Sequence, residues 1–246
     1  MKTYYEPGVQ RSAKVNELFT RIAGRYDFIN DLQSFGLHRY WKKRVVKEAK
    51  PRPGENALDV CCGTGDIALE LARKGAEVTG LDFSERMLEI ARGRQSKRVT
   101  CTGLEANFAS MKFVSGDAQN IPFEDGTFDM VTIGYGLRNL TSWETGLQEM
   151  QRVAKPGGRV VILEFGKPQN AVWRMIYEGY LKVFSPALGL VFCGDSAAYS
   201  YILKSLKHYP AQRLVGEKMR EMGFGNVRVI DLLGGAMSIN YGEKGR

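Results

Sequence analysis

From Glu55 onward the sequence alternates short apolar runs with stretches of helical period, and this alternation limits the folds open to the chain. The runs at 57–61 and 77–82 are each followed by an amphipathic stretch, one at 66–73 and one that begins after Ser84. Further strands are predicted at 112–117, 128–133, 159–164, 227–233 and 235–241. Such alternation is typical of a parallel α/β sheet, and the glycine pair between the last two runs is typical of an antiparallel hairpin.

The chain divides into a helical N-terminal segment and a larger α/β domain. Apolar residues recur at helical spacing near 15–22 and again near 41–49, before the loop PRPGE. Residues 1–53 are therefore predicted to be a helical lead-in that packs on the main domain, which takes up residues 54–246.

Two stretches of the main domain do not follow the strand–helix alternation. The region at about 170–206 is apolar and aromatic with helical spacing, so we expect a helical cover over the sheet. Its aromatic side chains are explained by core packing, and they could also line a tunnel for an apolar substrate. The basic stretch 93–110 has no hydrophobic period and is predicted to be a loop.

Positive charge is concentrated near the N-terminus. The chain has a net charge of +8, and residues 1–53 contain 12 Lys and Arg against 5 Asp and Glu. This asymmetry suggests an anionic partner, either a nucleic acid or an acidic membrane surface. The alternative is a solvated helical face without a partner.

Several protein classes are not expected from the sequence. The longest apolar stretch, at 183–193, is far shorter than the roughly 20 residues needed to cross a bilayer. The N-terminal residues lack an apolar run and a cleavage site, so we expect a cytoplasmic protein. The four cysteines, at 61, 62, 101 and 193, do not have the spacing of a zinc site or of a disulfide framework. We therefore expect reduced thiols and no metal.

A glycine-rich loop, Cys62–Asp66, joins the first predicted strand to the helix that follows it. Gly63, Thr64 and Gly65 in such a loop let a ligand approach backbone N–H groups closely, although a plain tight turn is the alternative. Asp82 ends the next strand, 17 residues after Gly65, where a carboxylate can accept both ribose hydroxyls. The two features together predict a nucleoside cofactor.

Charge near the loop favours S-adenosylmethionine (SAM) over NAD. Asp59 and Asp66 flank the glycines, and carboxylates would repel a pyrophosphate but attract the ammonium and sulfonium groups of SAM. Asp117 and Ala118 end the third strand, where they could contact the adenine ring, unless Asp117 is only a turn or N-cap residue. An NAD-dependent oxidoreductase is disfavoured on this ground.

Two longer stretches resemble the ubiquinone/menaquinone biosynthesis C-methyltransferase family. The first is Tyr26-Asp27-Phe28-Ile29-Asn30 with Ser34, His38 and Trp41, and the second runs from Arg152 to Glu164. Gly136-Leu137-Arg138-Asn139 and Gly234-Gly235 also match the family. The sequence departs from the family pattern at Ile29, Gln33, Gly166 and Asn240, and Asn240 stands where relatives usually have His.

The resemblance implies a Rossmann-like α/β fold, the seven-stranded sheet of class I SAM-dependent methyltransferases, and SAM as the cofactor. It implies methylation of a ring carbon of a polyprenylated quinol, with demethylmenaquinol favoured over a demethylated ubiquinol intermediate. It also suggests a homodimer. The alternatives are methylation of another hydrophobic small molecule and a nucleic-acid-binding protein, but the segment Gly134-Tyr135-Gly136-Leu137 lacks the Pro-Pro-aromatic motif of amino-group methyltransferases. The predicted cofactor-binding residues are Asp59, Gly63, Thr64, Gly65, Asp82, Phe83, Asp117, Ala118 and Gly134.

Carbon methylation requires removal of a quinol proton, so the candidate catalytic residues are those that could accept this proton or stabilise the resulting oxyanion. Arg138 and Asn139 could orient a water or stabilise a phenolate, unless Arg138 is a structural cation. His38 titrates near neutrality and is a candidate base, with a structural histidine as the alternative. Tyr26 is a further candidate on the helical lead-in, where core packing would also explain it.

Overall fold

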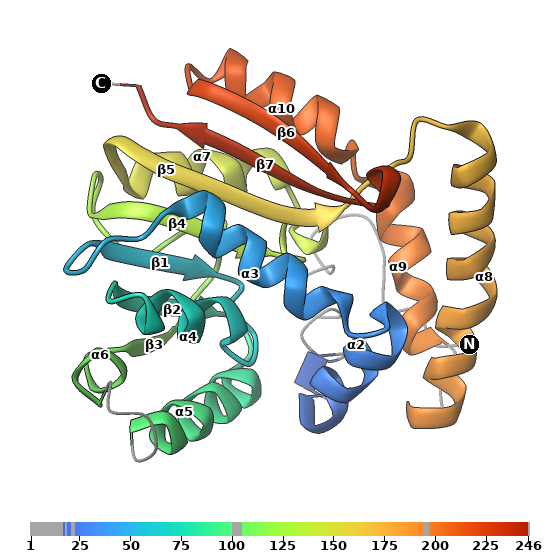
Figure 1. Cartoon of the computed structure of the whole chain (residues 1–246), viewed down its shortest axis with the longest axis horizontal. Coiled ribbons are helices and arrows are strands. Elements are labelled where there is room, and N and C mark those ends of the chain that lie inside the picture. Colours follow the sequence, from blue (N-terminus) through green and yellow to red (C-terminus); the bar gives the residue numbers. More distant parts are fainter. Residues whose placement is uncertain (1–16, 18, 21–22, 100–104, 194–196, 246) are drawn as a thin grey trace.

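The computed structural model describes residues 17, 19–20, 23–99, 105–193 and 197–245, and these form a seven-stranded sheet between helices (Figure 1). The strand order is β3-β2-β1-β4-β5-β7-β6. The strands are β1 (Asn56–Val60), β2 (Glu77–Asp82), β3 (Lys112–Ser115), β4 (Phe128–Gly134), β5 (Ala154–Phe165), β6 (Gly225–Leu232) and β7 (Met237–Glu243). Strands β1 to β5 are parallel, and β7 lies antiparallel between β5 and β6. The predicted α/β sheet with a terminal hairpin is confirmed.

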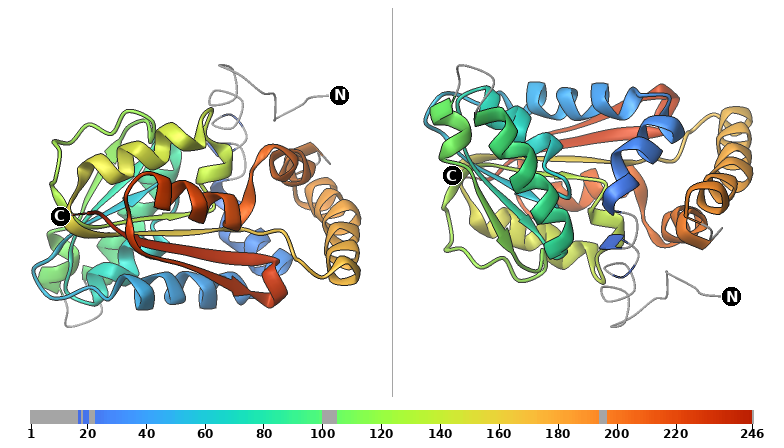
Figure 2. Two further views of the ribbon diagram at one scale, coloured as in Figure 1. Left: turned by 90° about the horizontal axis from the view of Figure 1, so that it is seen from above. Right: turned by 90° about the horizontal axis from the view of Figure 1, so that it is seen from below.

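Two layers of helices cover the two faces of the sheet (Figure 2). One layer contains α3 (Leu37–Ala49), α4 (Asp66–Arg73), α5 (Glu85–Val99) and α6 (Glu105–Ala109), and the other contains α7 (Trp143–Val153) and α10 (Ala211–Glu221). Three short 3₁₀ helices, η1 (Ala23–Arg25), η2 (Leu137–Asn139) and η3 (Leu233–Gly235), lie in the connections.

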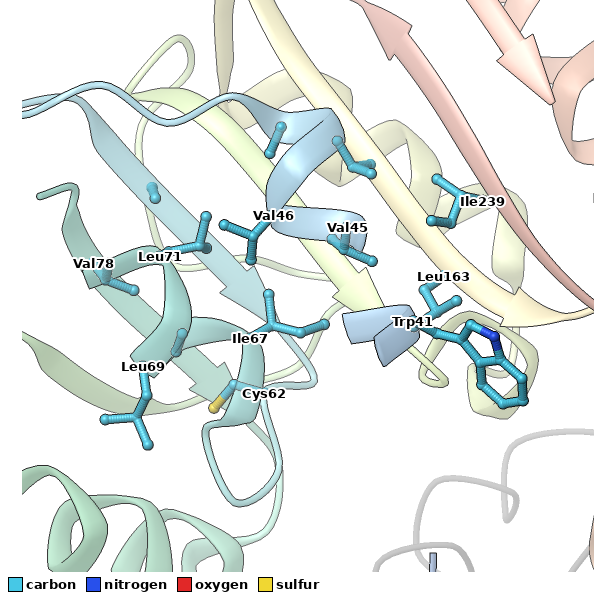
Figure 3. Close-up of a cluster of buried hydrophobic side chains, with 14 of the residues drawn as sticks. Trp41, Val45, Val46, Cys62, Ile67, Leu69, Leu71, Val78, Leu163 and Ile239 are labelled. Carbon is cyan, nitrogen blue, oxygen red and sulfur yellow. The ribbon is translucent and has the colours of Figure 1, made fainter. Parts of the chain in front are cut away.

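Alternating side chains of the strands build a core on each face of the sheet. In β5, Val161 and Leu163 belong to the cluster beneath α3 and α4, whereas Val160 and Ile162 belong to the cluster beneath α7 and α10. Successive side chains of a strand point to opposite faces, so a sheet covered on both sides requires an apolar run without polar positions. Figure 3 shows the first of these clusters, to which α3 contributes Val45.

Helices α2 (Tyr26–Ser34), α8 (Ala171–Cys193) and α9 (Ala197–His208) lie beyond the sheet at the carboxyl ends of β4 and β5 (Figure 1). Helix α8 packs against α9 and α2, and α9 also contacts η2. The helical segment predicted as a cover at about 170–206 therefore exists, as α8 and α9, but these helices extend one end of the domain and do not lie over a face of the sheet.

The prediction of a loop at 93–110 is wrong over most of its length. Helix α5 continues to Val99, and α6 occupies Glu105–Ala109, while 100–104 lie outside the described residues. The Gln95 side chain donates hydrogen bonds to the carbonyl groups of Phe108 and Met111, and Phe108 is fully buried. These tertiary contacts stabilise a helix whose polar sequence carries no amphipathic signal.

The predicted N-terminal helices are only partly testable. Most of the helix near 15–22 lies outside the described residues, although 17, 19 and 20 are helical. The helix predicted near 41–49 is confirmed as α3, which begins earlier, at Leu37, and packs against α4 and β5. A domain boundary at residue 53 stays a prediction.

Candidate active site

A cavity of about 100 Å³ lies at the carboxyl ends of β1, β2 and β4. In the strand order, the chain moves outward from β1 through β2 to β3 and then returns to β4 on the other side of β1. Parallel α/β sheets bind ligands where the order reverses in this way. We call it the strand-end cavity. Of the predicted cofactor-binding residues, those that line it are Gly63, Asp82, Phe83, Asp117, Ala118 and Gly134.

Asp82 is held at the rim of the strand-end cavity by two backbone N–H groups. Its Oδ2 atom accepts a hydrogen bond from Gly63 N–H and its Oδ1 atom from Ser84 N–H, both at 2.8 Å. Burial raises the pKa of Asp82, and the backbone hydrogen bonds oppose this shift. Each carboxylate oxygen has two lone pairs, so the carboxylate retains acceptor capacity for two hydroxyl groups.

Two glycines shape the cavity wall. Gly63 has a φ of +54°, and a Cβ added there would meet no protein atom within 4 Å, so the backbone faces open space. A Cβ at Gly134 would lie 2.7 Å from the Cδ1 atom of Ile67. A serine side chain at this position would therefore require Ile67 to move.

Thr64, Gly65 and Asp59 are not among the described residues that line the cavity. The Thr64 hydroxyl donates to Asp27 Oδ1 at 2.9 Å and is buried against α2. Gly65 packs against α5, because a Cβ there would lie 3.2 Å from the side chain of Ala91. In this structure they lie behind the loop, and their predicted roles in cofactor binding stay predictions.

The two carboxylates that favoured SAM by charge are both engaged within the protein. Asp59 is buried beneath the loop, where it accepts hydrogen bonds from Ala68 N–H at 3.1 Å and from the Thr132 hydroxyl at 2.7 Å. Burial raises the pKa of Asp59 to about 7. Asp66 forms an ion pair with Lys42 at 2.6 Å on the outer side of α4. Asp82 and Asp117 are the acidic side chains that line the cavity itself.

Asp117 and Phe83 lie at the cavity mouth. Asp117 Oδ1 accepts from Gln119 N–H at 2.9 Å, which fixes the direction of the carboxylate. The Phe83 side chain is 51% exposed, a high value for a phenyl ring next to a buried strand. An exposed ring beside a polar acceptor offers a stacking surface for a flat heterocycle.

A second, larger cavity of about 240 Å³ lies between α2, α3, α8 and the end of β5. We call it the apolar cavity, because most of its lining is aromatic or aliphatic. The aromatic side chains in it are Phe35, Trp41, Tyr135, Phe165, Trp173, Tyr177 and Tyr180. Tyr135, which follows β4 with a φ of +61°, lines both cavities. The two cavities therefore share a wall.

Arg138 stands in the apolar cavity as half of a buried ion pair. Its Nη1 atom lies 2.8 Å from Glu164 Oε1, and both side chains are under 4% exposed. The same nitrogen donates to the carbonyl group of Tyr135 at 2.6 Å, and the guanidinium carbon lies 4.7 Å from the centre of the Phe165 ring. Burial raises the pKa of Glu164, while the charge of Arg138 opposes this shift.

Asn139 follows Arg138 in η2 and lines the strand-end cavity. Its Nδ2 atom donates to the carbonyl group of Tyr135 at 3.1 Å. The Oδ1 atom is buried and has no hydrogen-bond partner among the residues that the structure describes. Tyr26 begins α2, but its side chain lies outside the described parts of the chain.

His38 lines the apolar cavity from α3. Its Nε2 atom lies 2.8 Å from Asp31 Oδ1, and the pKa of Asp31 is lowered to about 2, chiefly by its hydrogen bond with Arg39. Burial and the charge of Lys42 lower the pKa of His38, so its imidazole is neutral near neutral pH. The Nδ1 atom is buried without a partner in the described part of the chain.

Sequence patterns did not predict Asp31, Tyr135 or the surroundings of Asn240. Asp31 lies seven residues before His38, and only the turn between α2 and α3 brings the two together. Tyr135 lies between two glycines at the end of a strand, and this pattern could have indicated a residue that lines a site.

Asn240 faces α10, where its Nδ2 atom donates to the carbonyl group of Gln212 at 2.7 Å. It is not among the described residues that line either cavity.

Comparison with known proteins identifies the family. The sequence model of the ubiE/COQ5 methyltransferase family matches residues 8–244. The chain belongs to the ubiE/COQ5 methyltransferase family. A demethylmenaquinone methyltransferase of Staphylococcus aureus (strain JH9) is 41% identical over 236 residues, which are 94% of each chain. The resemblance noted from the two sequence stretches is thus confirmed.

Solved structures agree with the fold of this methyltransferase. A SAM-dependent methyltransferase of Aquifex aeolicus has a TM-score of 0.60 at 20% identity, over 89% of this chain and 97% of that one. A phosphoethanolamine N-methyltransferase of Haemonchus contortus, bound to S-adenosylhomocysteine, has a TM-score of 0.62 at 17% identity, over 84% of this chain and 53% of that one. At such identities the likeness shows the fold alone, a Rossmann-like methyltransferase sheet.

The methyltransferase uses SAM, and the strand-end cavity suits that cofactor. The backbone at Gly63 faces open space, and the Asp82 carboxylate keeps acceptor capacity. The buried Asn139 Oδ1 atom has no hydrogen-bond donor among the described residues. Among the described residues, no cluster of His, Cys, Asp and Glu could hold a metal ion, and no helix is long and apolar enough to cross a membrane. Cys61 and Cys62 are free thiols; residue 101 and the Cys193 side chain lie outside the described parts.

The buried Asp59 predicts a specific pH dependence of stability. Its pKa of about 7 in the fold exceeds the value of about 3.9 in an unfolded chain, so folding favours the protonated form. Its contribution to stability is complete below about pH 4 and declines as the pH rises through about 7, by up to about 1.4 kcal/mol per pH unit. Asp59→Asn keeps a neutral group that can pair with Ala68 and Thr132, so this decline should vanish.

Urea unfolding of the wild type and of Asp59→Asn at about pH 5 and about pH 7 measures this effect. We expect the wild type to lose more free energy of unfolding than the variant between the two pH values. Equal losses would contradict a buried, titrating Asp59.

Proposed function

We propose that this methyltransferase transfers the methyl group of SAM to a ring carbon of a polyprenylated quinol, with demethylmenaquinol as the acceptor. One observation carries the proposal: the strand-end cavity and the apolar cavity share Tyr135 as a wall, so a cofactor in one adjoins an apolar substrate in the other. The S. aureus relative is named for the same reaction. A demethylated ubiquinol intermediate, or another hydrophobic small molecule, is the competing acceptor.

SAM fits the strand-end cavity through groups at the ends of β1 to β4. Asp82 would accept the ribose hydroxyls, while Asp117, Ala118 and the Phe83 ring would hold the adenine. Bound there, SAM supplies an electrophilic methyl group on a sulfonium, and the protein has to align the acceptor with it. Gly134 and Asn139 lie in the wall nearest the shared Tyr135.

The apolar cavity suits a quinol ring with an apolar tail. Its aromatic walls offer stacking surfaces for a bicyclic ring. Tyr177 and Leu181, on the inner side of α8, also line the cavity. The polar side chains that reach it include Arg138 and His38. A cavity with few polar groups orients its ligand by those groups, so we assign them to the two quinol oxygens.

Methyl transfer requires that a quinol hydroxyl lose its proton, because the oxyanion pushes electrons onto the ring carbon that attacks the methyl group. We assign the proton acceptor to His38, since ionised Asp31 holds the proton on Nε2 and leaves the Nδ1 lone pair free to accept one. Arg138 would stabilise the oxyanion. The methylated ring carbon then loses its own proton to water, which restores the aromatic ring as the phenolate, and protonated His38 returns its proton to the phenolate oxygen.

A membrane-dissolved substrate requires access to a membrane. We propose that the basic N-terminal region holds the enzyme against anionic lipid, where each Lys or Arg contributes about 1 kcal/mol. Lys43, Lys47 and Lys50 of this region are exposed. A homodimer remains a proposal from the family resemblance.

Substitution of Asp82 tests the cofactor site. We expect Asp82→Asn to weaken SAM binding by about ten- to hundredfold, because a charge-assisted hydrogen bond contributes about 1.5–3 kcal/mol. Asp129→Asn is the matched control, since Asp129 also accepts a backbone N–H, from Asn56, but lies at the opposite end of β4. Calorimetric titration of SAM into both folded variants makes the measurement. Equal SAM affinities of the Asp82→Asn and Asp129→Asn variants would show that Asp82 does not bind the cofactor.

Transfer of a labelled methyl group tests the reaction itself. With methyl-labelled SAM and a short-chain demethylmenaquinol, we expect the label on a ring carbon of the quinol. The matched control is the same quinol already methylated at that carbon, which should take up no label. Parallel incubation with a demethylated ubiquinol intermediate ranks the acceptors. Label on an oxygen, or SAM binding without transfer to any quinol, would contradict the proposal.

The pH profile tests His38 as proton acceptor. The neutral imidazole is the active form, so kcat should fall as the pH drops through its pKa, which lies below 6.5. Asp31 raises that pKa, so Asp31→Asn should move the acidic limb to lower pH. His38→Gln should lower kcat by about 10²–10⁴-fold with SAM affinity retained. An unchanged acidic limb in Asp31→Asn and unchanged kcat in His38→Gln would assign His38 a structural role.

A further inference from the structure

Helix α8 is apolar on two opposite sides, although only one of them packs against the protein. Its inner side carries Tyr177 and Leu181, which are buried. Its outer side presents large apolar side chains at helical spacing with more than half of their surface exposed. These are Val172 (63%), Met175 (69%), Ile176 (53%), Val183 (73%) and Leu190 (61%). We call this set the outer face of α8.

The charged residues of α8 form a single narrow stripe. Arg174, Glu178 and Lys182 follow one another at intervals of four residues, and all three are exposed. A helix with a broad apolar surface and one charged stripe is typical of helices that lie in a membrane interface. Figure 1 places α8 at the outer edge of the molecule, with α9 between it and the end of the sheet.

The mouth of the apolar cavity opens beside this face. Phe35, Leu37, Ile176 and Leu233 line the cavity and are nevertheless 74%, 39%, 53% and 50% exposed. They come from the α2–α3 turn, from α8 and from η3. The Phe35 ring packs on Tyr180 of α8 at a centroid distance of 6.4 Å, so turn and helix form one continuous apolar surface around the opening.

We propose that the outer face of α8, together with the Phe35 turn, docks into the interfacial layer of an anionic lipid bilayer. The cavity mouth then opens toward the acyl chains. The purpose assigned to the docking, delivery of a prenylated quinol, rests on the proposed function. The docking itself rests on the exposed apolar surface and its charges.

Charge and geometry favour a bilayer over a second protein chain as the occupant. Arg39, Lys43 and Lys182 are exposed on the helices that meet at the mouth, and residues 23–53 carry a clear excess of Lys and Arg. Anionic headgroups complement these charges. A protein partner on the same surface would cover the mouth and block the entry of a long-tailed substrate, whereas a bilayer would supply it.

The test combines vesicle binding with a depth probe. Met175→Gln, Val183→Gln and Leu190→Gln together remove apolar surface from the outer face without altering a cavity-lining residue. Leu214→Gln is the control, because Leu214 is an exposed apolar residue of α10, away from the outer face of α8. With phosphatidylcholine–phosphatidylglycerol vesicles, we expect the triple variant to need at least about tenfold more lipid for half-saturation, and the control to match the wild type. Measured against the three native tryptophans of the wild type, brominated lipid should quench the added fluorescence of a tryptophan introduced by Val183→Trp and not that of one introduced by Leu214→Trp.

Equal binding of the triple variant and the wild type, or no quenching at position 183, would overturn the docking. Conversion of a dimer into a monomer by the triple substitution, with vesicle binding retained, would assign the face to a second copy of the chain. Methylation of a short-chain quinol in detergent should be unchanged in the triple variant. Absence of that activity in a wild-type enzyme that still binds vesicles would refute the proposed function and leave the docking intact.

Discussion

The buried ion pair between Arg138 and Glu164 holds the wall between the two cavities. Glu164 is the next-to-last residue of the central strand β5, and it accepts hydrogen bonds from Arg138 Nη1, from Arg138 N–H and from Phe165 N–H. Removal of one partner from such a pair typically costs about 3–5 kcal/mol, because the other charge is left buried and uncompensated. The pair thereby fixes η2, which carries Asn139 toward one cavity and Arg138 toward the other.

The reversal of strand order at β1 and β4 explains why the strand-end cavity lies beside the apolar cavity. The ends of β1 and β2 provide Gly63 and Asp82, while the end of β4 provides Gly134 and Tyr135. Helices α2, α3 and α8 then enclose the space beyond β5. Apolar runs and turn glycines predicted this sheet, since a strand buried on both faces leaves a clear sequence signal. The polar end of α5 left none, because its stability comes from contacts with distant residues such as Phe108.

The sequence predicted which loops line the strand-end cavity better than which side chains face it. Asp82 and Asp117 end strands, and their positions in the sheet place them at the cavity. Asp59 and Thr64 belong to the same motif, but their partners, Thr132 and Asp27, lie 73 and 37 residues away and draw both side chains away from it. The pairing of His38 with its carboxylate depends on a helix turn and could not be deduced from spacing.

We infer that Glu164 positions the shared wall for methyl transfer and does not itself bind SAM. Single-turnover transfer and SAM affinity, measured together in Glu164→Gln, test it most directly. Glu149→Gln is the control, because Glu149 also pairs with an arginine and accepts a backbone N–H, but lines neither cavity. We expect a transfer rate reduced by about a hundredfold or more in folded Glu164→Gln, with SAM affinity within a few-fold of the wild type. An unchanged transfer rate, or a loss of SAM affinity that matches the loss of rate, would contradict it.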